Sequence, residues 1–278
     1  MKKIVTLTVG TTMLCGLLLS SGVGSINADK IDYKSSHSLL IKGTNNHSMG
    51  ELIKKDTSPR INESSGISAA ETGRPSKDFI DISSNNGEIT KEEFQIMKNK
   101  YGIKGVIVKL TEGNVYKNPE APKQIANAKA AGLKVSVYHF SWFDSTQGAI
   151  EEAQYFLDYA KELNLDGDTS FVNDYEKVDA PLESNPTSNS LKFAEVLKSG
   201  GYKNVYHYSS KNWFSSVLDM KKLGAENCWI AEWPMNPTED NLLNTSNAAW
   251  QWANDLYFPE LGDNRQFDIS TDYLNAFT

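Results

Sequence analysis

GVIVKLTEGNVYKNPEAPKQIANAKAAGLKVSVYHF, residues 105–140, is the stretch of the sequence that decides the fold. Its two ends are short apolar runs, Gly105–Leu110 and Lys134–Phe140, which predict buried strands. The longer segment Ala121–Ala131 between them predicts a helix. A strand, a helix and a second strand in this order predict one unit of a parallel sheet, because parallel strands need a crossover connection.

The same alternation continues on both sides of this stretch. Strands are predicted at Phe79–Ile82, Ser170–Glu176, Asn204–Ser209, Cys228–Trp233, Ala248–Trp252 and Phe267–Ile269, and helices at Lys91–Lys100, Gln147–Leu163, Thr187–Ser199 and Asn212–Asp219. Asn185 followed by Pro186 predicts the N-cap and first turn of the helix at Thr187–Ser199. Eight strands over about 200 residues have the size of a closed barrel. Since the last three strands leave little room for helices, we predict an α/β protein with an irregular, TIM-like barrel.

The first 77 residues differ from this pattern. Lys2 and Lys3 precede an apolar run, Ile4–Leu19, and small residues lead to Ala28, which predicts a secretory signal peptide over 1–28 that is cleaved near Ala28. Threonines and a glycine interrupt the apolar run, so cleavage is favoured over a membrane anchor. Residues 29–77 are polar with a single aromatic, which favours a disordered linker or pro-segment over a small folded domain. The folded domain is expected over 78–278.

Charge and cysteine content exclude several classes of function. Removal of residues 1–28 takes away two lysines and no acidic residue, so the formal charge of −7 becomes −9. No basic patch indicates a nucleic-acid partner. Only Cys228 remains in the mature chain, so no intrachain disulfide is expected. We also expect a monomer, and we expect no cofactor. The histidines show no metal-ligand spacing, and no metal site is predicted: His37, His47, His139 and His207.

Acidic residues follow several of the predicted strands, where the active sites of such barrels gather. They are Asp81, Glu112, Asp174, Glu176, Glu232 and Asp268. Asp174 and Glu176 point to the same side of one strand, because side chains alternate with period two. Two acids that close together raise at least one pKa, and the resulting pair of an acid and a carboxylate is what glycoside hydrolysis requires. Glu112 is as well explained by a salt bridge, and Glu232 by a solvated charge.

Aromatic residues gather at the same strand ends. Flat apolar faces with a polar edge suit sugar rings, although about half of these residues should belong to the core. We expect His139 to be a hydrogen-bonded core residue. The candidate substrate-binding residues are Glu112 and the aromatic residues Tyr138, Tyr208, Trp233, Trp250 and Trp252.

Six motifs occur in one order along the chain. They are Asp81-Ile82-Ser83 with Gly87, Lys109-Leu110-Thr111-Glu112-Gly113, Tyr138-His139-Phe140, Asp174-Tyr175-Glu176, Trp250-Gln251-Trp252 and Phe267-Asp268-Ile269. This order resembles the family 25 glycoside hydrolases, which are muramidases, from Asp78 to the C-terminus. The resemblance implies a (β/α)5(β)3 barrel that cleaves the β-1,4 bond between N-acetylmuramic acid and N-acetylglucosamine in peptidoglycan, with retention at the anomeric carbon.

The resemblance also implies roles for individual residues. Glu176 would be the general acid, and Asp174 would stabilise the developing positive charge. Asp81 and Asp268 would hold the substrate and the acid, and Tyr138 would line the subsite. The chain departs from the family pattern at Asn86, Asn173 and Tyr175. Asn173 would face the helix layer, where its amide needs a partner.

Three other functions remain open from the sequence. A chitinase-like barrel also ends its fourth strand in alternating acids, but Val172-Asn173-Asp174-Tyr175-Glu176 lacks the additional upstream aspartate of that pattern. A non-catalytic wall-binding module of the same fold would be favoured by a lost carboxylate, and the four carboxylates are all present. An adhesion factor would need residues 29–77 to engage a partner.

Overall fold

The computed structural model describes residues 52–53, 66–176 and 185–278. The chain divides into two units, Met1–His47 and Ser48–Thr278. The first unit lies wholly outside the described residues, as does the predicted signal peptide. Everything below therefore concerns the second unit.

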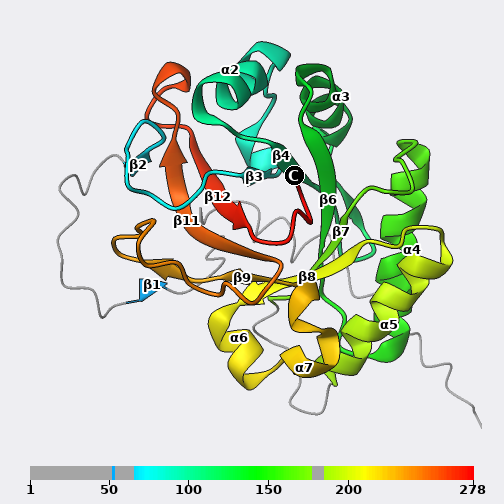
Figure 1. The fold of residues 1–278 in the computed structure, drawn as a ribbon. Coiled ribbons are helices and arrows are strands. Elements are labelled where there is room, and N and C mark those ends of the chain that lie inside the picture. Colours follow the sequence, from blue (N-terminus) through cyan, green and yellow to red (C-terminus); the bar gives the residue numbers. More distant parts are fainter. Residues whose placement is uncertain (1–51, 54–65, 177–184) are drawn as a thin grey trace, which may run out of the picture. The chain divides into compact units, whose positions relative to one another are not determined.

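Eight strands close into a barrel (Figure 1). Seven of them are parallel to their neighbours, and the eighth runs antiparallel between the last and the first, which closes the ring. The predicted TIM-like class is confirmed. In the order of the ring the strands are β3 (Phe79–Ile82), β4 (Gly105–Glu112), β6 (Lys134–Phe140), β7 (Phe171–Asp174), β8 (Val205–Ser210), β9 (Cys228–Ala231), β11 (Ala249–Tyr257) and β12 (Gln266–Asp272).

The α-helices lie outside the ring and follow only the first five strands (Figure 1). Between β9 and β12 the described chain has one short 3-10 turn, η3 (Pro259–Leu261), and no α-helix. The barrel is therefore of the irregular (β/α)5(β)3 type. Among the described residues no helix is long and apolar enough to cross a membrane. The helices are α2 (Lys91–Tyr101), α3 (Ala121–Ala131), α4 (Thr146–Glu162), α5 (Pro186–Ser199), α6 (Lys211–Ser216) and α7 (Met220–Leu223), with the 3-10 turns η1 (Ser84–Asn86) and η2 (Ala225–Asn227).

Local capping explains where two of the helices begin. Thr90 and Glu93 form a capping box at the start of α2, in which each side chain accepts a hydrogen bond from the other residue's backbone. Asn185 caps α5 by accepting from the Ser188 amide, and Pro186 occupies the first turn, as predicted. Thr90 and Asn185 therefore mark the positions where α2 and α5 begin.

Among the described residues there are four further short strands: two of them extend the barrel sheet, and the other two form a separate two-stranded sheet. The strands are β1 (Leu52–Ile53), β2 (Ile67–Ser68), β5 (Tyr116–Lys117) and β10 (Trp233–Pro234). β1 pairs with β10, β5 with β4, and β2 lies parallel to the end of β11. Ile67 is 2% exposed, and Arg74 hydrogen-bonds to Asn236 and to the Pro237 carbonyl. Residues 66–77, which the sequence assigned to the linker, thus pack against the domain.

Alternation along the strands separates two buried layers. One layer fills the space between the strands and the helices and contains Val108, Phe156 and Phe193. The other fills the barrel interior, where Phe277 near the C-terminus contacts Phe79 with ring centroids 5.0 Å apart. The C-terminus accordingly lies within the ring of strands (Figure 1).

Candidate active site

Strand register brings four carboxyl groups to the end of the barrel at which the seven parallel strands terminate. Asp81 on β3 lies directly opposite Asp268 on β12. Asp174 ends β7, and Glu176 lies two residues beyond it, where the charges of Asp174, Asp268 and Asp81 act on it. Asp81 is 3% and Asp174 1% exposed, whereas Glu176 and Asp268 are half-buried. The four predicted catalytic residues therefore form one cluster.

The Asp174 and Glu176 carboxyls form a pair that holds a proton. Burial raises the pKa of Glu176 well above its ordinary value, and the neighbouring charge of Asp174 raises it further. Burial also raises the pKa of Asp174, to about 8, although the Glu176 carboxyl and the positive charge of Lys109 partly offset that rise. Neither Asp174 oxygen accepts a hydrogen bond of normal geometry from a described residue. The interaction between the two carboxyls raises the pKa of Glu176 and lowers that of Asp174, so Glu176 is the member that keeps its proton to higher pH.

Asp81 and Asp268 form a second pair. Burial raises the pKa of Asp81 to about 6, although hydrogen bonds from Gln251 and Asp268 favour its ionised form. Burial and the charge of Asp81 raise the pKa of Asp268 well above its ordinary value. The proton of this pair therefore resides on Asp268, and Asp81 is the carboxylate.

Lys109 places a positive charge inside the barrel beside these acids. It lies on β4 with the same alternation as Ile107, is 4% exposed, and forms an ion pair with Glu112. Its ammonium lies 4.9 Å from the centre of the Phe140 ring. Sequence reasoning did not select Lys109 as a site residue, but period two along β4 predicts that it faces inward. Within the described residues no group of acids, histidines or cysteines has the arrangement of a metal site.

The predicted substrate-binding residues separate into three groups. Tyr138 lies in the inner layer, where burial and the charges of Asp81, Asp174 and Asp268 raise its pKa. Tyr208 and Trp233 also lie there and are almost fully buried. Glu112 forms an ion pair with Lys109, and the charges of both residues act on Asp174.

Trp250 and Trp252 are not brought into the site. Both are 0% exposed in the outer layer, and their indole nitrogens donate to the backbone oxygens of Glu232 and Ser76. The reason is alternation: Gln251 between them points into the barrel, so its two neighbours point outward. Trp250 and Trp252 therefore belong to the core and not to the candidate site.

Buried polar groups behind β6 and β7 confirm two expectations. His139 is 0% exposed and hydrogen-bonds to Thr111 and Glu152, as expected of a core histidine. The Asn173 amide has the partners that its position requires: its oxygen accepts from Ser141, and its nitrogen lies 3.2 Å from His207 Nδ1. This network supports the strand that carries Asp174.

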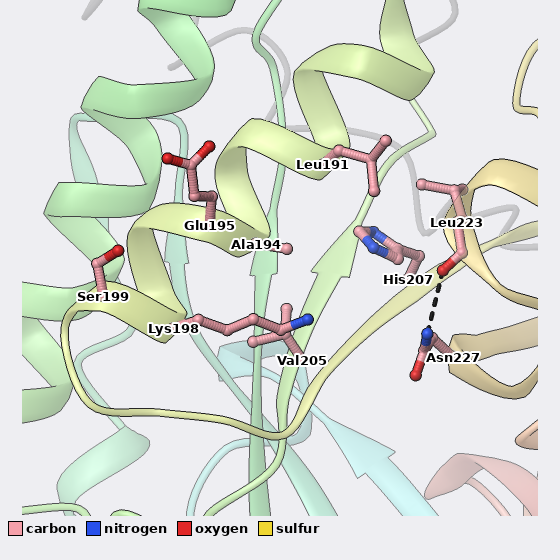
Figure 2. A pocket seen from close by; sticks show the side chains of 9 residues that line it. All are labelled: Leu191, Ala194, Glu195, Lys198, Ser199, Val205, His207, Leu223 and Asn227. Atoms are coloured by element: carbon pink, nitrogen blue, oxygen red, sulfur yellow. Dashed lines mark hydrogen bonds between the residues drawn. The ribbon is translucent and has the colours of Figure 1, made fainter.

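A separate pocket of about 420 Å³ lies on the outer side of the barrel (Figure 2). His207 contributes to its wall, and burial, reinforced by the positive charge of Lys198, lowers the pKa of this histidine to about 4. The other lining residues come mainly from α5 and include Leu191 and Glu195. None of the four clustered carboxylates lines this pocket, so it is distinct from the candidate site.

The buried acids predict that stability falls as the pH rises. Between 3.8, the ordinary pKa of an aspartate, and about 6, the pKa of folded Asp81, the native state binds more protons than the unfolded state. The free energy of unfolding must then decrease with pH over this window, by about 3 kcal/mol from Asp81 alone. Raised pKa values of Asp174, Glu176 and Asp268 act with the same sign. Urea unfolding at pH 4 and pH 7 measures the slope.

Asp81→Asn supplies the matched comparison for this prediction. The variant should be more stable than the original protein at pH 7, and the difference should shrink towards pH 4. Asp240→Asn, at an exposed position, should change neither value by more than about 0.5 kcal/mol. A stability advantage of Asp81→Asn that is equal at both pH values would contradict the assignment of a raised pKa.

Comparison with known proteins agrees with this geometry. The family model described as "Glycosyl hydrolases family 25" matches residues 80–261. The lysozyme of Streptococcus phage Cp-7 is 27% identical over 200 residues, which are 70% of this chain and 50% of that protein. The autolytic lysozyme of Clostridium acetobutylicum is 30% identical over 176 residues, which are 63% of this chain and 49% of that protein. The chain thus spans about half the length of these curated relatives.

Two solved structures share the fold. The catalytic domain of endolysin ply40 from bacteriophage P40 of Listeria monocytogenes superimposes with a TM-score of 0.58 at 16% identity, over 71% of this chain and 93% of that one. The modular autolysin LytC from Streptococcus pneumoniae, in complex with a synthetic peptidoglycan ligand, gives 0.58 at 22% identity, over 70% of this chain and 46% of that one. Together with the family model, which covers more than half of the residues, these findings show that the chain belongs to family 25 of the glycosyl hydrolases.

Proposed function

We propose that this protein is a secreted muramidase that hydrolyses the β-1,4 bond between N-acetylmuramic acid and N-acetylglucosamine in peptidoglycan. The observation that carries the proposal is the Glu176 and Asp174 pair at the end of β7, in which the contact between the two carboxyls favours the proton on Glu176 and the ionised form of Asp174. An acid and a carboxylate side by side are the two groups that glycosidic cleavage requires. The names of the relatives, lysozyme and autolytic lysozyme, support the same substrate.

The first step would break the glycosidic bond. Glu176 donates its proton to the glycosidic oxygen as the bond from that oxygen to the anomeric carbon breaks. Asp174 orients the substrate's acetamido group so that its carbonyl oxygen bonds to the anomeric carbon and gives a cyclic oxazolinium. The carboxylate of Asp174 offsets the positive charge of this intermediate. Direct attack by Asp174 is the alternative first step.

The second step would restore the protonated Glu176. Glu176, now a carboxylate, removes a proton from water as the water oxygen bonds to the anomeric carbon. The acetamido oxygen leaves from the opposite face, so the configuration at the anomeric carbon is retained. Asp81, Asp268 and Tyr138 would position the sugar, and the charge of Lys109 favours ionised Asp174.

The predicted signal peptide places this activity outside the cell, at the wall. The peptide itself lies outside the described residues, so secretion rests on Lys2, Lys3 and the apolar run after them. Residues 29–51, ahead of β1, would then act as a linker.

Hydrolysis of purified peptidoglycan by the mature protein tests the proposal. A rise in reducing sugars without new free amino groups is expected, because a glycosidase opens the glycan and leaves the peptides intact. Chitin oligosaccharides serve as the comparison substrate. Cleavage of chitin in preference to peptidoglycan would favour the chitinase-like alternative, and wall binding without any new reducing ends would favour a non-catalytic module.

A further inference from the structure

Gln251 lies at the centre of the inner layer and joins three elements to Asp81. Its side chain is 0% exposed. The amide oxygen accepts hydrogen bonds from the Tyr208 hydroxyl at 2.9 Å and from the Trp233 indole nitrogen at 3.0 Å. The amide nitrogen donates to Asp81 Oδ2 at 3.0 Å. All of these contacts are made by described residues on β8, β10, β11 and β3.

The two donors fix the orientation of the Gln251 amide. An indole nitrogen is a donor only, so the group that faces Trp233 must be an acceptor. If the amide were rotated by half a turn, its NH2 group would face the Trp233 indole N–H, which cannot accept, and its oxygen would face the carboxyl group of Asp81. Because buried polar groups without partners are costly, the amide nitrogen is held against Asp81.

Because the Gln251 amide nitrogen can only donate, its hydrogen bond favours the ionised form of Asp81 over the protonated form. The Asp81 and Asp268 residues lie opposite each other on β3 and β12, and the charge of Asp81 raises the pKa of Asp268. An amide hydrogen can be accepted by either form of Asp81, but the hydrogen bond is stronger when the carboxylate is charged. The other titratable groups facing Asp81 are Asp174 and Glu176 at the end of β7, Tyr138 on β6 and Tyr208 on β8.

We propose that Gln251 is a positioning residue that keeps Asp81 ionised and leaves Asp268 protonated. The proton of this pair is then on Asp268, just as Glu176 is the more firmly protonated member of the other pair. Asp81 is thereby available as a carboxylate for the substrate or for positive charge on it, and Asp268 as a donor. Only the kinetic consequence rests on the proposed muramidase activity.

13C NMR of the side-chain carboxyl carbons in aspartate-labelled protein tests the proposal without an activity measurement. Asp81→Asn and Asp268→Asn assign the two resonances. In the original protein Asp81 should titrate at a lower pH than Asp268. In Gln251→Met, which has a similar length and no donor, the pKa of Asp81 should rise by about one unit or more. Gln154→Met, on the exposed face of α4, is the matched control and should leave both titrations unchanged.

Tyr208→Phe provides a second variant in case Gln251→Met does not fold. It removes one of the two donors that orient the amide and should raise the pKa of Asp81 by a smaller amount. The acid limb of kcat/KM for peptidoglycan should move to higher pH in both variants. The proposal would be overturned if Asp268 had the lower pKa of the two in the original protein. It would also be overturned if the pKa of Asp81 were unchanged in a folded variant. A lack of hydrolysis with the expected titrations would instead refute the muramidase activity alone.

Discussion

Glu176→Gln is expected to lower kcat for peptidoglycan hydrolysis by about 10³-fold, because an amide cannot protonate the leaving oxygen. KM should change little, since the side chain keeps its size and the sugar contacts stay. The variant should also be at least as stable as the original protein at pH 7, because it removes an acid whose pKa is raised in the folded state. Initial rates of reducing-end release at several substrate concentrations give kcat and KM, and thermal unfolding gives the stability.

Glu195→Gln is the matched control for this substitution. Glu195 lies on the exposed face of α5, beside the outer pocket and apart from the carboxyl cluster. It undergoes the same change of group and should retain the original kcat. A Glu176→Gln variant with more than a tenth of the original kcat would contradict the role of Glu176 as the general acid.

Phe277→Ala is expected to lower the free energy of unfolding by about 4 kcal/mol. Phe277 is fully buried in the barrel interior, where its ring lies 4.8 Å from that of Tyr206 and 5.7 Å from that of Trp229. Both carboxylate oxygens of Asp272 accept from the backbone of this segment, which holds the ring in place. The cavity left by the ring cannot refill from solvent without wetting apolar walls. Urea unfolding at pH 6 measures the loss.

Leu274→Ala is the control for Phe277→Ala, because it removes an apolar side chain from the same segment. Leu274 is 50% exposed, so its loss should change the free energy of unfolding by less than about 1 kcal/mol. Equal effects of the two substitutions would mean that Phe277 does not fill the interior of the barrel in solution.

Local patterns were sufficient to predict most of the barrel. The bounds of β3, β6 and α3 are those predicted from the sequence, because short apolar runs and their flanking breakers are local signals. The strand β2 was missed for the opposite reason. Ile67 is an isolated apolar residue in a polar stretch, and only its pairing with Leu256 far along the chain makes it a strand.

The candidate site was predictable where alternation was applied and not where it was ignored. Period two correctly placed Asp174 and Glu176 on one side of their strand. The same rule, applied to β11, would have selected Gln251 instead of Trp250 and Trp252, and applied to β4 it would have selected Lys109. Which of two close acids keeps the proton depends on burial and partners from other strands, which the sequence of one strand does not contain.

The reducing end that the mature protein creates in purified peptidoglycan tests the central claim most directly. The products are reduced with borohydride, digested, and identified by mass spectrometry, with Glu176→Gln treated in parallel. We predict reduced N-acetylmuramic acid from the original protein and about the background amount from the variant. Reduced N-acetylglucosamine as the new end, or equal release by both proteins, would contradict the assignment of this barrel as a muramidase with Glu176 as its acid.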